Sequence, residues 1–266
     1  MFTRHETLNR KQHANLRFGQ GKRFGFAAKA TSIPVLSAEA SNIAREYVLV
    51  FDRAQPQAQA LLGSQQDFNG YVTEDGQWLG RYIPAFIRAY PFRPGVLPSQ
   101  QENTKDHQLV VLIDPDAPHF QDNAGTPLLD ENGAPSELLN KVQGILRHLH
   151  QGIIQTAAQV NQLQRLGLLV EQRIMIKRLN IAIEGFRVIN QERLKTLSGA
   201  ELAELRDSGA LQLIYTHLIS LNNLQDSPLL RQPVAKPAVP EPAPVQDFFT
   251  DEDFNLDFSK FRSGSE

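Results

Sequence analysis

Apolar positions in the first half of the chain fall in short runs separated by turn residues. Residues 47–51 and 109–113 are continuous apolar runs, and an Asp-Pro-Asp segment follows the second one directly. Runs of this length and composition are typical of buried strands. Asp75-Gly76 lies between two aromatic, β-prone segments and favours a hairpin, because glycine accepts the positive φ that the turn requires. The first half is therefore predicted to be mostly antiparallel β-structure.

The second half shows helical periodicity. After Pro135, apolar residues recur at steps of three and four, which predicts one face of a long helix. The residues of this apolar stripe are Leu138, Val142, Ile145, Leu149, Ile153, Ala157, Val160 and Leu163. Ser198 and Glu201 match a capping box, which predicts the start of a helix. Gly209 is expected to end that helix. A last helix is predicted over residues 210–224.

The composition changes at Pro228. Six prolines fall between residues 228 and 244, and they predict an extended linker that cannot pack a regular face. Beyond it, an acidic–aromatic tail combines carboxylates with six large apolar residues, which are Phe248, Phe249, Phe254, Leu256, Phe258 and Phe261. We expect this tail to dock on a partner protein, as an induced helix or as an added strand. Folding back onto the basic N-terminal arm is the alternative.

Together these patterns predict an α+β protein with a single domain over residues 15–225. A mostly antiparallel β N-terminal half is expected to pack with a helical C-terminal half. A flexible basic arm is predicted for residues 1–14. A disordered proline-rich linker is predicted for residues 226–246, and the interaction tail for residues 247–266. The segment after residue 225 is expected to be dispensable for folding.

Composition narrows the classes of function. The 266 residues include 27 Lys and Arg against 29 Asp and Glu, a balance that argues against a nucleic-acid-binding protein. Cysteine is absent, which excludes thiol catalysis and cysteine-ligated metal sites. No apolar run reaches the roughly 20 residues of a membrane span, and no signal peptide is recognisable. A cytoplasmic location without a membrane span, and without a cofactor, is expected.

Aromatic and arginine side chains concentrate in one segment of the first half. This aromatic–arginine block consists of Trp78, Arg81, Tyr82, Arg88, Tyr90, Phe92 and Arg93. Such residues together suit stacking, cation–π contacts and protein interfaces, so the block is a candidate ligand- or partner-binding surface. The competing interpretation is a core hairpin that the arginines buttress.

Signatures of catalysis are weak. The chain has no Gly-x-Ser-x-Gly elbow, no P-loop and no His-Glu-x-x-His motif. Asp114, Asp116 and His119 follow a predicted strand and form a weak candidate for a metal or acid–base site. The same residue types also suit the turn that ends a strand.

Several segments together resemble the bacterial SapC family over roughly residues 15–225. They include residues 47–51, Asp75-Gly76-Gln77-Trp78 and residues 205–211, and the most specific is Tyr-Ile-Pro-Ala-Phe-Ile-Arg-Ala-Tyr-Pro-Phe at residues 82–92. The resemblance implies no assigned catalytic residues. Members of this family are often encoded near outer-membrane TonB-dependent receptors and near cupin-like or flavin-halogenase-like enzymes, so the resemblance implies a role alongside bacterial uptake or modification systems. The peptide-transporter permease of the same name is excluded, because this chain lacks membrane spans.

The sequence therefore favours a non-catalytic accessory protein of a bacterial uptake, surface or protein-modification system. It is expected to bind another protein through the tail and through the aromatic–arginine block, and to bind no nucleic acid. The alternative is an enzyme or enzyme subunit with a site near Asp114 and His119. A small-molecule sensor is a third class.

Overall fold

Antiparallel strands form the largest sheet of the computed structural model, which describes residues 3–19, 21, 23–98, 107–121 and 125–233. The strand order is β10 (Leu169–Glu171), β13 (Phe186–Ile189), β4 (Val48–Asp52), β5 (Ala58–Leu61) and β3 (Ser32–Val35). Every neighbouring pair is antiparallel. The central strand β4 is buried from Val48 to Phe51. Burial on both faces explains why its sequence is a continuous apolar run, as predicted.

Three smaller antiparallel sheets complete the β-structure. One has the order β1 (Glu6–Thr7), β7 (His107–Ile113), β6 (Phe92–Pro98). Another has the order β8 (Phe120–Gln121), β2 (Arg17–Phe18), β9 (Thr126–Pro127). The last pairs β11 (Ile174–Ile176) with β12 (Ile181–Ile183).

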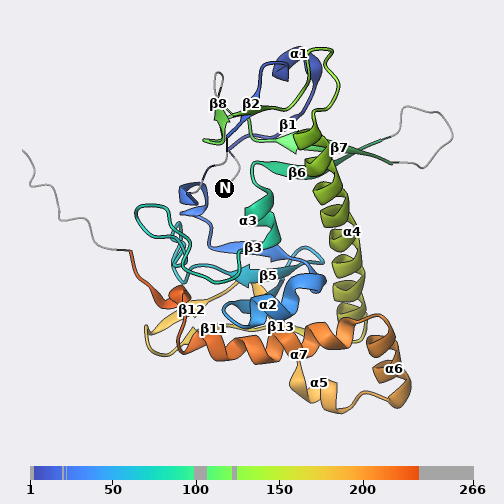
Figure 1. Cartoon of the computed structure of the whole chain (residues 1–266). Helices are drawn as coiled ribbons and strands as arrows, with labels where there is room; N and C mark the ends of the chain where they lie inside the picture. Colours follow the sequence, from blue (N-terminus) through green and yellow to red (C-terminus); the bar gives the residue numbers. More distant parts are fainter. Residues whose placement is uncertain (1–2, 20, 22, 99–106, 122–124, 234–266) are drawn as a thin grey trace, which may run out of the picture. The chain divides into compact units, whose positions relative to one another are not determined.

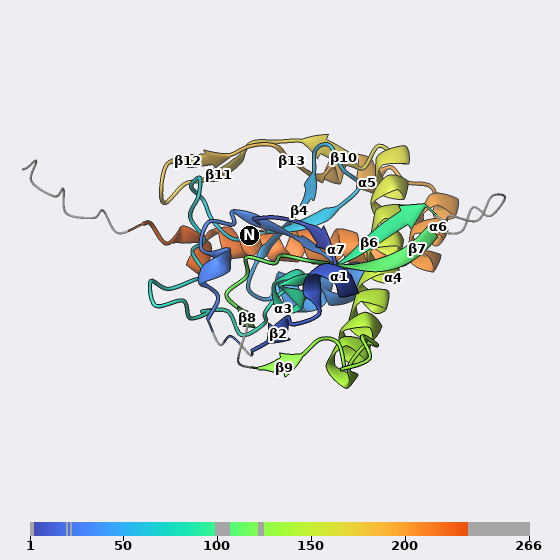
Figure 2. The same ribbon diagram turned by 90° about the horizontal axis from the view of Figure 1, so that it is seen from above.

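The helices gather towards the second half of the chain, and the predicted α+β class is confirmed. They are α1 (Arg10–His13), α2 (Ala40–Ala44), α3 (Ala85–Ala89), α4 (Glu137–Arg165), α5 (Gln191–Lys195), α6 (Gly199–Asp207) and α7 (Ala210–Ser220). Single 3-10 turns are η1 (Gly25–Ala27), η2 (Ser37–Glu39), η3 (Leu221–Leu224) and η4 (Pro228–Leu230). Helix α7 packs on β4 and β13, and Figure 2 shows it beneath these strands. Within the described ranges, no helix has the length and apolar character needed to cross a membrane.

Helix α4 joins two separate hydrophobic clusters. Towards its C-terminus, Val160 and Leu163 belong to the large core around the five-stranded sheet. Nearer its N-terminus, Leu146 packs with Phe92 and Ile113 in a smaller cluster. Figure 1 shows α4 running from the β6–β7 hairpin to α7. The helix begins at Glu137, two residues later than Pro135, because the Ser136 hydroxyl caps it by accepting the Leu139 amide at 3.2 Å.

The predicted helix boundaries around Gly209 are confirmed. Ser198 and Glu201 form the capping box of α6, and Gly209 takes a left-handed φ of 78° between α6 and α7. The predicted hairpin at Asp75-Gly76 is reduced to one bridge between Val72 and Trp78. The Trp78 indole turns inward instead and donates to the Tyr47 hydroxyl at 2.9 Å.

The first residues of the chain differ from the flexible arm predicted for residues 1–14. Residues 3–14 are joined to the fold, because β1 pairs with β7 and Thr3 binds a buried carboxylate. The Thr3 amide and hydroxyl both donate to Asp114, each at 2.9 Å. The basic composition of the arm did not predict this contact, because the groups that bind Asp114 are an uncharged backbone amide and a hydroxyl.

The folded unit also runs further than residue 225 and ends at Gln232. Leu229 is fully buried in the large core, and Arg231 donates from Nη1 to the Gly70 carbonyl at 2.8 Å. Pro228 begins η4, a position that suits proline because the first helical turn needs no N–H from it. The proline cluster therefore begins inside the fold, while the acidic–aromatic tail lies outside the described residues.

Candidate functional site

An apolar groove of about 800 Å³ lies between α3 and α4. Its α4 wall holds Leu138, Lys141, Val142, Ile145, Leu146, His148, Leu149, Gln151, Gly152 and Gln155. The remaining lining residues are Phe18, Leu36, Ala38, Ala85, Arg88, Ala89, Tyr90 and Phe92. Figure 1 shows α3 alongside the middle of α4, between the sheets that hold the two ends of the long helix. We refer to this feature as the α3–α4 groove.

Small residues shape both walls of the α3–α4 groove. Ala85 and Ala89 lie one turn apart on α3, and both line the groove. On the opposite wall, a Cβ at Gly152 would lie only 2.8 Å from the Leu36 side chain. Glycine at this position therefore lets Leu36 pack directly against α4. The neighbouring Ser37 amide donates to the Thr156 hydroxyl at 2.8 Å, which fastens this wall in place.

The apolar stripe of α4 is wider than the part that other described residues cover. Leu146 and Leu149 are buried, but Ile145 is 57% exposed and Leu138 and Val142 are half-buried. The periodicity predicted that Ile145 would face the core. The structure leaves it exposed on the lining of the groove instead, because the smaller cluster packs against Leu138, Val142 and Leu146 and does not extend over Ile145. An apolar surface left open in this way is typical of binding sites.

Three basic side chains line the groove. Arg88 lies on the α3 side, Lys141 and His148 lie on the α4 side, and no lining residue is Asp or Glu. Arg88 is held in place, because Nε donates to the Ile83 carbonyl at 2.9 Å and Nη2 donates to the Tyr82 hydroxyl at 3.1 Å. Its guanidinium also lies 5.4 Å from the centre of the Tyr82 ring, within cation–π range.

The aromatic–arginine block divides between the core and the groove. Trp78 binds Tyr47, whose hydroxyl donates to the Tyr82 carbonyl. The Tyr82 hydroxyl donates to Glu39 Oε2 at 2.8 Å, and burial together with this carboxylate raises the pKa of Tyr82 to about 12. Trp78 and Tyr82 thus brace the fold from within.

The remaining block residues lie nearer the surface or in the groove. Arg81 and Arg93 have exposed side chains. Arg88, Tyr90 and Phe92 all line the α3–α4 groove. Structure therefore brings three of the seven predicted residues to one concave surface, and their binding role stays a prediction. Of the tail residues predicted to bind a partner, none falls within the described ranges.

Asp114, Asp116 and His119 do not converge as metal ligands. The buried Asp114 carboxylate accepts hydrogen bonds from Thr3 and, at 3.1 Å, from the Tyr90 hydroxyl. Burial alone would raise the pKa of Asp114, but these hydrogen bonds lower it below its usual value. Asp116 is exposed and lies 3.5 Å from Arg4. Across the described ranges, no group of three His, Asp or Glu side chains is arranged to hold a metal ion.

His119 faces an aromatic cage rather than a carboxylate. Its ring centre lies 5.4 Å from that of Phe26 and 5.3 Å from that of Tyr90. Burial lowers the pKa of His119, so the neutral ring is favoured. Its Nδ1 is buried and makes no hydrogen bond to any described residue.

Replacing Asp114 with asparagine is expected to lower the free energy of unfolding by about 2 kcal/mol. Oδ2 accepts the Thr3 amide and Oδ1 faces the Asp116 amide at 3.4 Å. Whichever oxygen becomes NH2, one backbone N–H therefore loses its acceptor. Urea unfolding of Asp114→Asn measures the loss. The exposed Asp116→Asn is the control and is expected to change stability by less than about 0.5 kcal/mol.

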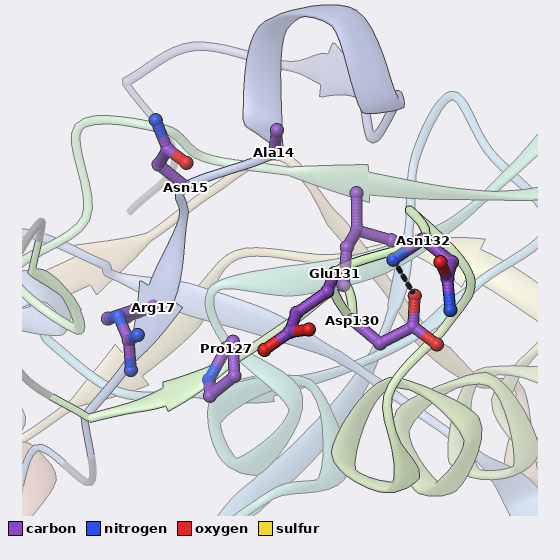
Figure 3. Close-up of a pocket in the computed structure, with 8 residues that line it drawn as sticks. Ala14, Asn15, Arg17, Pro127, Asp130, Glu131 and Asn132 are labelled. Atoms are coloured by element: carbon purple, nitrogen blue, oxygen red, sulfur yellow. Dashed lines mark hydrogen bonds between the residues drawn. The ribbon is translucent and has the colours of Figure 1, made fainter.

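A second, polar hollow lies between the α1–β2 connection and the turn after β9. Figure 3 shows Asn15 and Arg17 on one side and Asp130, Glu131 and Asn132 on the other. The Asp130 carboxylate is occupied within its own turn, because it accepts the Asn132 amide at 2.9 Å and the Ala134 amide at 2.8 Å. These contacts are those of an Asx turn, so the position of the Asp130 carboxylate has a structural explanation. The polar hollow is therefore a weaker candidate for a binding site than the α3–α4 groove.

Sequence patterns did not single out the α4 residues of the groove. Leu138, Val142, Ile145 and Leu149 were predicted to form the core-facing stripe of an amphipathic helix, and not one wall of a groove. A usable signal was present, because the apolar stripe continues through a helix of 29 residues. One small core rarely covers a stripe of that length, since globular helices average about 11–12 residues.

A family model described as SapC matches residues 8–226 of the chain. The match covers more than half of the sequence and includes α3, α4 and every lining residue of the α3–α4 groove. No curated protein and no solved structure matches the chain. The geometry of the groove is therefore the main source for a functional interpretation.

Proposed function

The chain belongs to the SapC family, and from that premise we propose that it is a non-catalytic accessory protein that binds another protein in the α3–α4 groove. The observation that carries this proposal is the open apolar stripe of α4, with Ile145 57% exposed at the mouth of a groove of about 800 Å³. A soluble protein exposes such a surface at a cost in free energy, because water contacts apolar area that a partner could cover.

The chemistry of the lining supports binding over catalysis. Its ionisable side chains are Arg88, Tyr90, Lys141 and His148, and it holds no Ser, Thr, Asp or Glu. A hydrolase or a general acid–base enzyme needs a nucleophile, or a base paired with an orienting group. The groove supplies apolar area and basic side chains, which suit recognition.

The acidic–aromatic tail is the second partner-binding element of this proposal. Its sequence provides the aromatic anchors and acids described above. Family membership directs the search for the partner to bacterial uptake, surface and protein-modification systems.

Co-purification of the tagged full chain from the native cell tests the proposed function. A partner protein is expected to be retained by the unaltered chain and lost from Ile145→Glu, because a carboxylate would be placed at the mouth of the apolar groove. Ile154→Glu is the matched control. Ile154 is also 57% exposed on α4, but nine positions away it lies on about the opposite side of the helix. Equal retention of every partner by both variants would contradict the proposal.

The alternative function is an enzyme or enzyme subunit that uses the region of Asp114 and His119. The observation in its favour is the buried His119 Nδ1, which has no hydrogen-bond partner among the described residues. Metal analysis of the purified chain distinguishes the two functions. A stoichiometric divalent metal that is lost from His119→Gln would favour the enzyme.

A further inference from the structure

We propose that the occupant of the α3–α4 groove is an amphipathic helix of a partner protein, with acidic residues flanking its apolar face. This inference rests on the proposed function and specifies the partner chemistry. It is argued from the length of the groove, its opening to solvent and the charge along its rims.

The length and walls of the groove suit a helix. From Leu138 to Gln155, the α4 wall spans 17 residue steps, or about 26 Å at 1.5 Å per residue. A helix that anchors at positions i, i+4 and i+7 needs about 11 Å for one set of anchors. The wall therefore accommodates two consecutive sets. The small side chains of Ala85 and Ala89 on α3 leave room for them.

Because the groove is open to solvent, its occupant needs one apolar face and one polar face. Ile145 is more than half exposed, while Leu146 beside it is buried. An occupant that covered Ile145 would still keep one side in water. That arrangement suits an amphipathic helix, because its polar face remains solvated while its apolar stripe is covered.

The charge along the rims selects acidic flanks. Lys141 and His148 lie two turns apart on α4, and Arg88 lies across the groove on α3. Lys141 pairs with Glu137 at 2.6 Å, but both side chains are mostly exposed, so this pair is weak and exchangeable. No acidic residue lines the groove to repel a carboxylate. Acids on both sides of an apolar stripe would therefore meet a basic group on each rim.

Titration of the full chain with labelled peptides tests the inference. The probe is a helical peptide of about 18 residues, or five turns, with Leu and Phe at anchor spacing and Glu on both flanks. The matched peptide carries Lys in place of Glu. We expect the Glu peptide to bind about tenfold more tightly, with an advantage that shrinks as salt is raised.

Two pairs of variants locate the binding and its charge dependence. Ile145→Glu is expected to weaken binding of the Glu peptide about tenfold, and Ile154→Glu to leave it unchanged. Lys141→Glu is expected to weaken the Glu peptide and strengthen the Lys peptide. Arg147→Glu is the charge control, because Arg147 is exposed on the same helix but does not line this groove.

Other outcomes would overturn the inference in different ways. Equal binding of both peptides, lost in Ile145→Glu, would keep a protein-binding groove and remove the acidic partner. Tighter binding of a free peptide of residues 246–262 at the same groove would assign it to a segment of this chain. Exclusion of both peptides by oleate would assign it to a lipid anion. If neither peptide binds and Ile145→Glu keeps every co-purifying partner, the proposed function fails as well.

Discussion

A chain that ends at Ser227 is expected to be less stable than a chain that ends at Gln232 by about 4 kcal/mol. The longer chain keeps Leu229, which is fully buried in the large core. It also keeps Arg231, whose guanidinium donates to the Gly70 and Val72 carbonyls at 2.8 and 3.2 Å. Urea unfolding of the two chains measures the difference. Equal stability would mean that η4 does not hold the fold together.

A single substitution separates the contribution of the buried side chain from that of chain length. In the full chain, Leu229→Ala is expected to lower the free energy of unfolding by about 3 kcal/mol, because a buried leucine leaves a cavity. Leu202→Ala on α6 is the control, since Leu202 is 37% exposed and its loss leaves no enclosed space. Similar losses for the two variants would contradict the predicted role of Leu229.

The stability of the fold is expected to fall between pH 6.5 and about pH 4 because of His217. This histidine is fully buried, and burial lowers its pKa from 6.5 to about 4. Nδ1 donates to the Leu49 carbonyl at 2.7 Å, and Nε2 accepts the Ile189 amide at 3.3 Å. Only the neutral ring makes both bonds. The unfolded chain takes up the proton first as pH falls, so stability is full above pH 6.5 and declines towards pH 4.

The size of this effect is about 3 kcal/mol, at roughly 1.4 kcal/mol for each unit of pKa. His217→Gln should remove that part of the pH dependence, because its amide can still donate to Leu49 and accept from Ile189. His148→Gln is the control, because His148 is exposed. Unfolding curves at pH 7, 5.5 and 4 measure the slopes. A His217→Gln slope equal to that of the unaltered chain would rule out His217 as the cause.

Local patterns in the sequence were sufficient to predict much of the fold. The apolar run at residues 47–51 became the buried strand β4, and the capping box at Ser198 began α6. Such signals depend on a few neighbouring residues and on a single physical cause. The two ends of the folded unit were harder to predict. Thr3 and Leu229 are fixed by contacts with Asp114 and the sheet core, which are distant in sequence.

The α3–α4 groove could not be predicted for a related reason. Periodicity shows that Val142, Ile145 and Leu149 share one face of a helix, but not how much of that face the rest of the chain covers. Coverage depends on where α3 lies, and α3 has only five residues. The aromatic–arginine block contributes three residues to the lining of the groove, which are Arg88, Tyr90 and Phe92. It also included Trp78 and Tyr82, which brace the core.

Photo-crosslinking from within the groove tests most directly whether it binds a protein. A photoreactive phenylalanine analogue is placed at position 145 of the full chain and, as the control, at position 154. After irradiation in the native cell, we expect one covalent protein adduct from position 145 and none from position 154. The crosslinked peptide is expected to carry apolar residues at helical spacing with acids on either side. No adduct at position 145, or the same adducts from both positions, would contradict a protein-binding groove between α3 and α4.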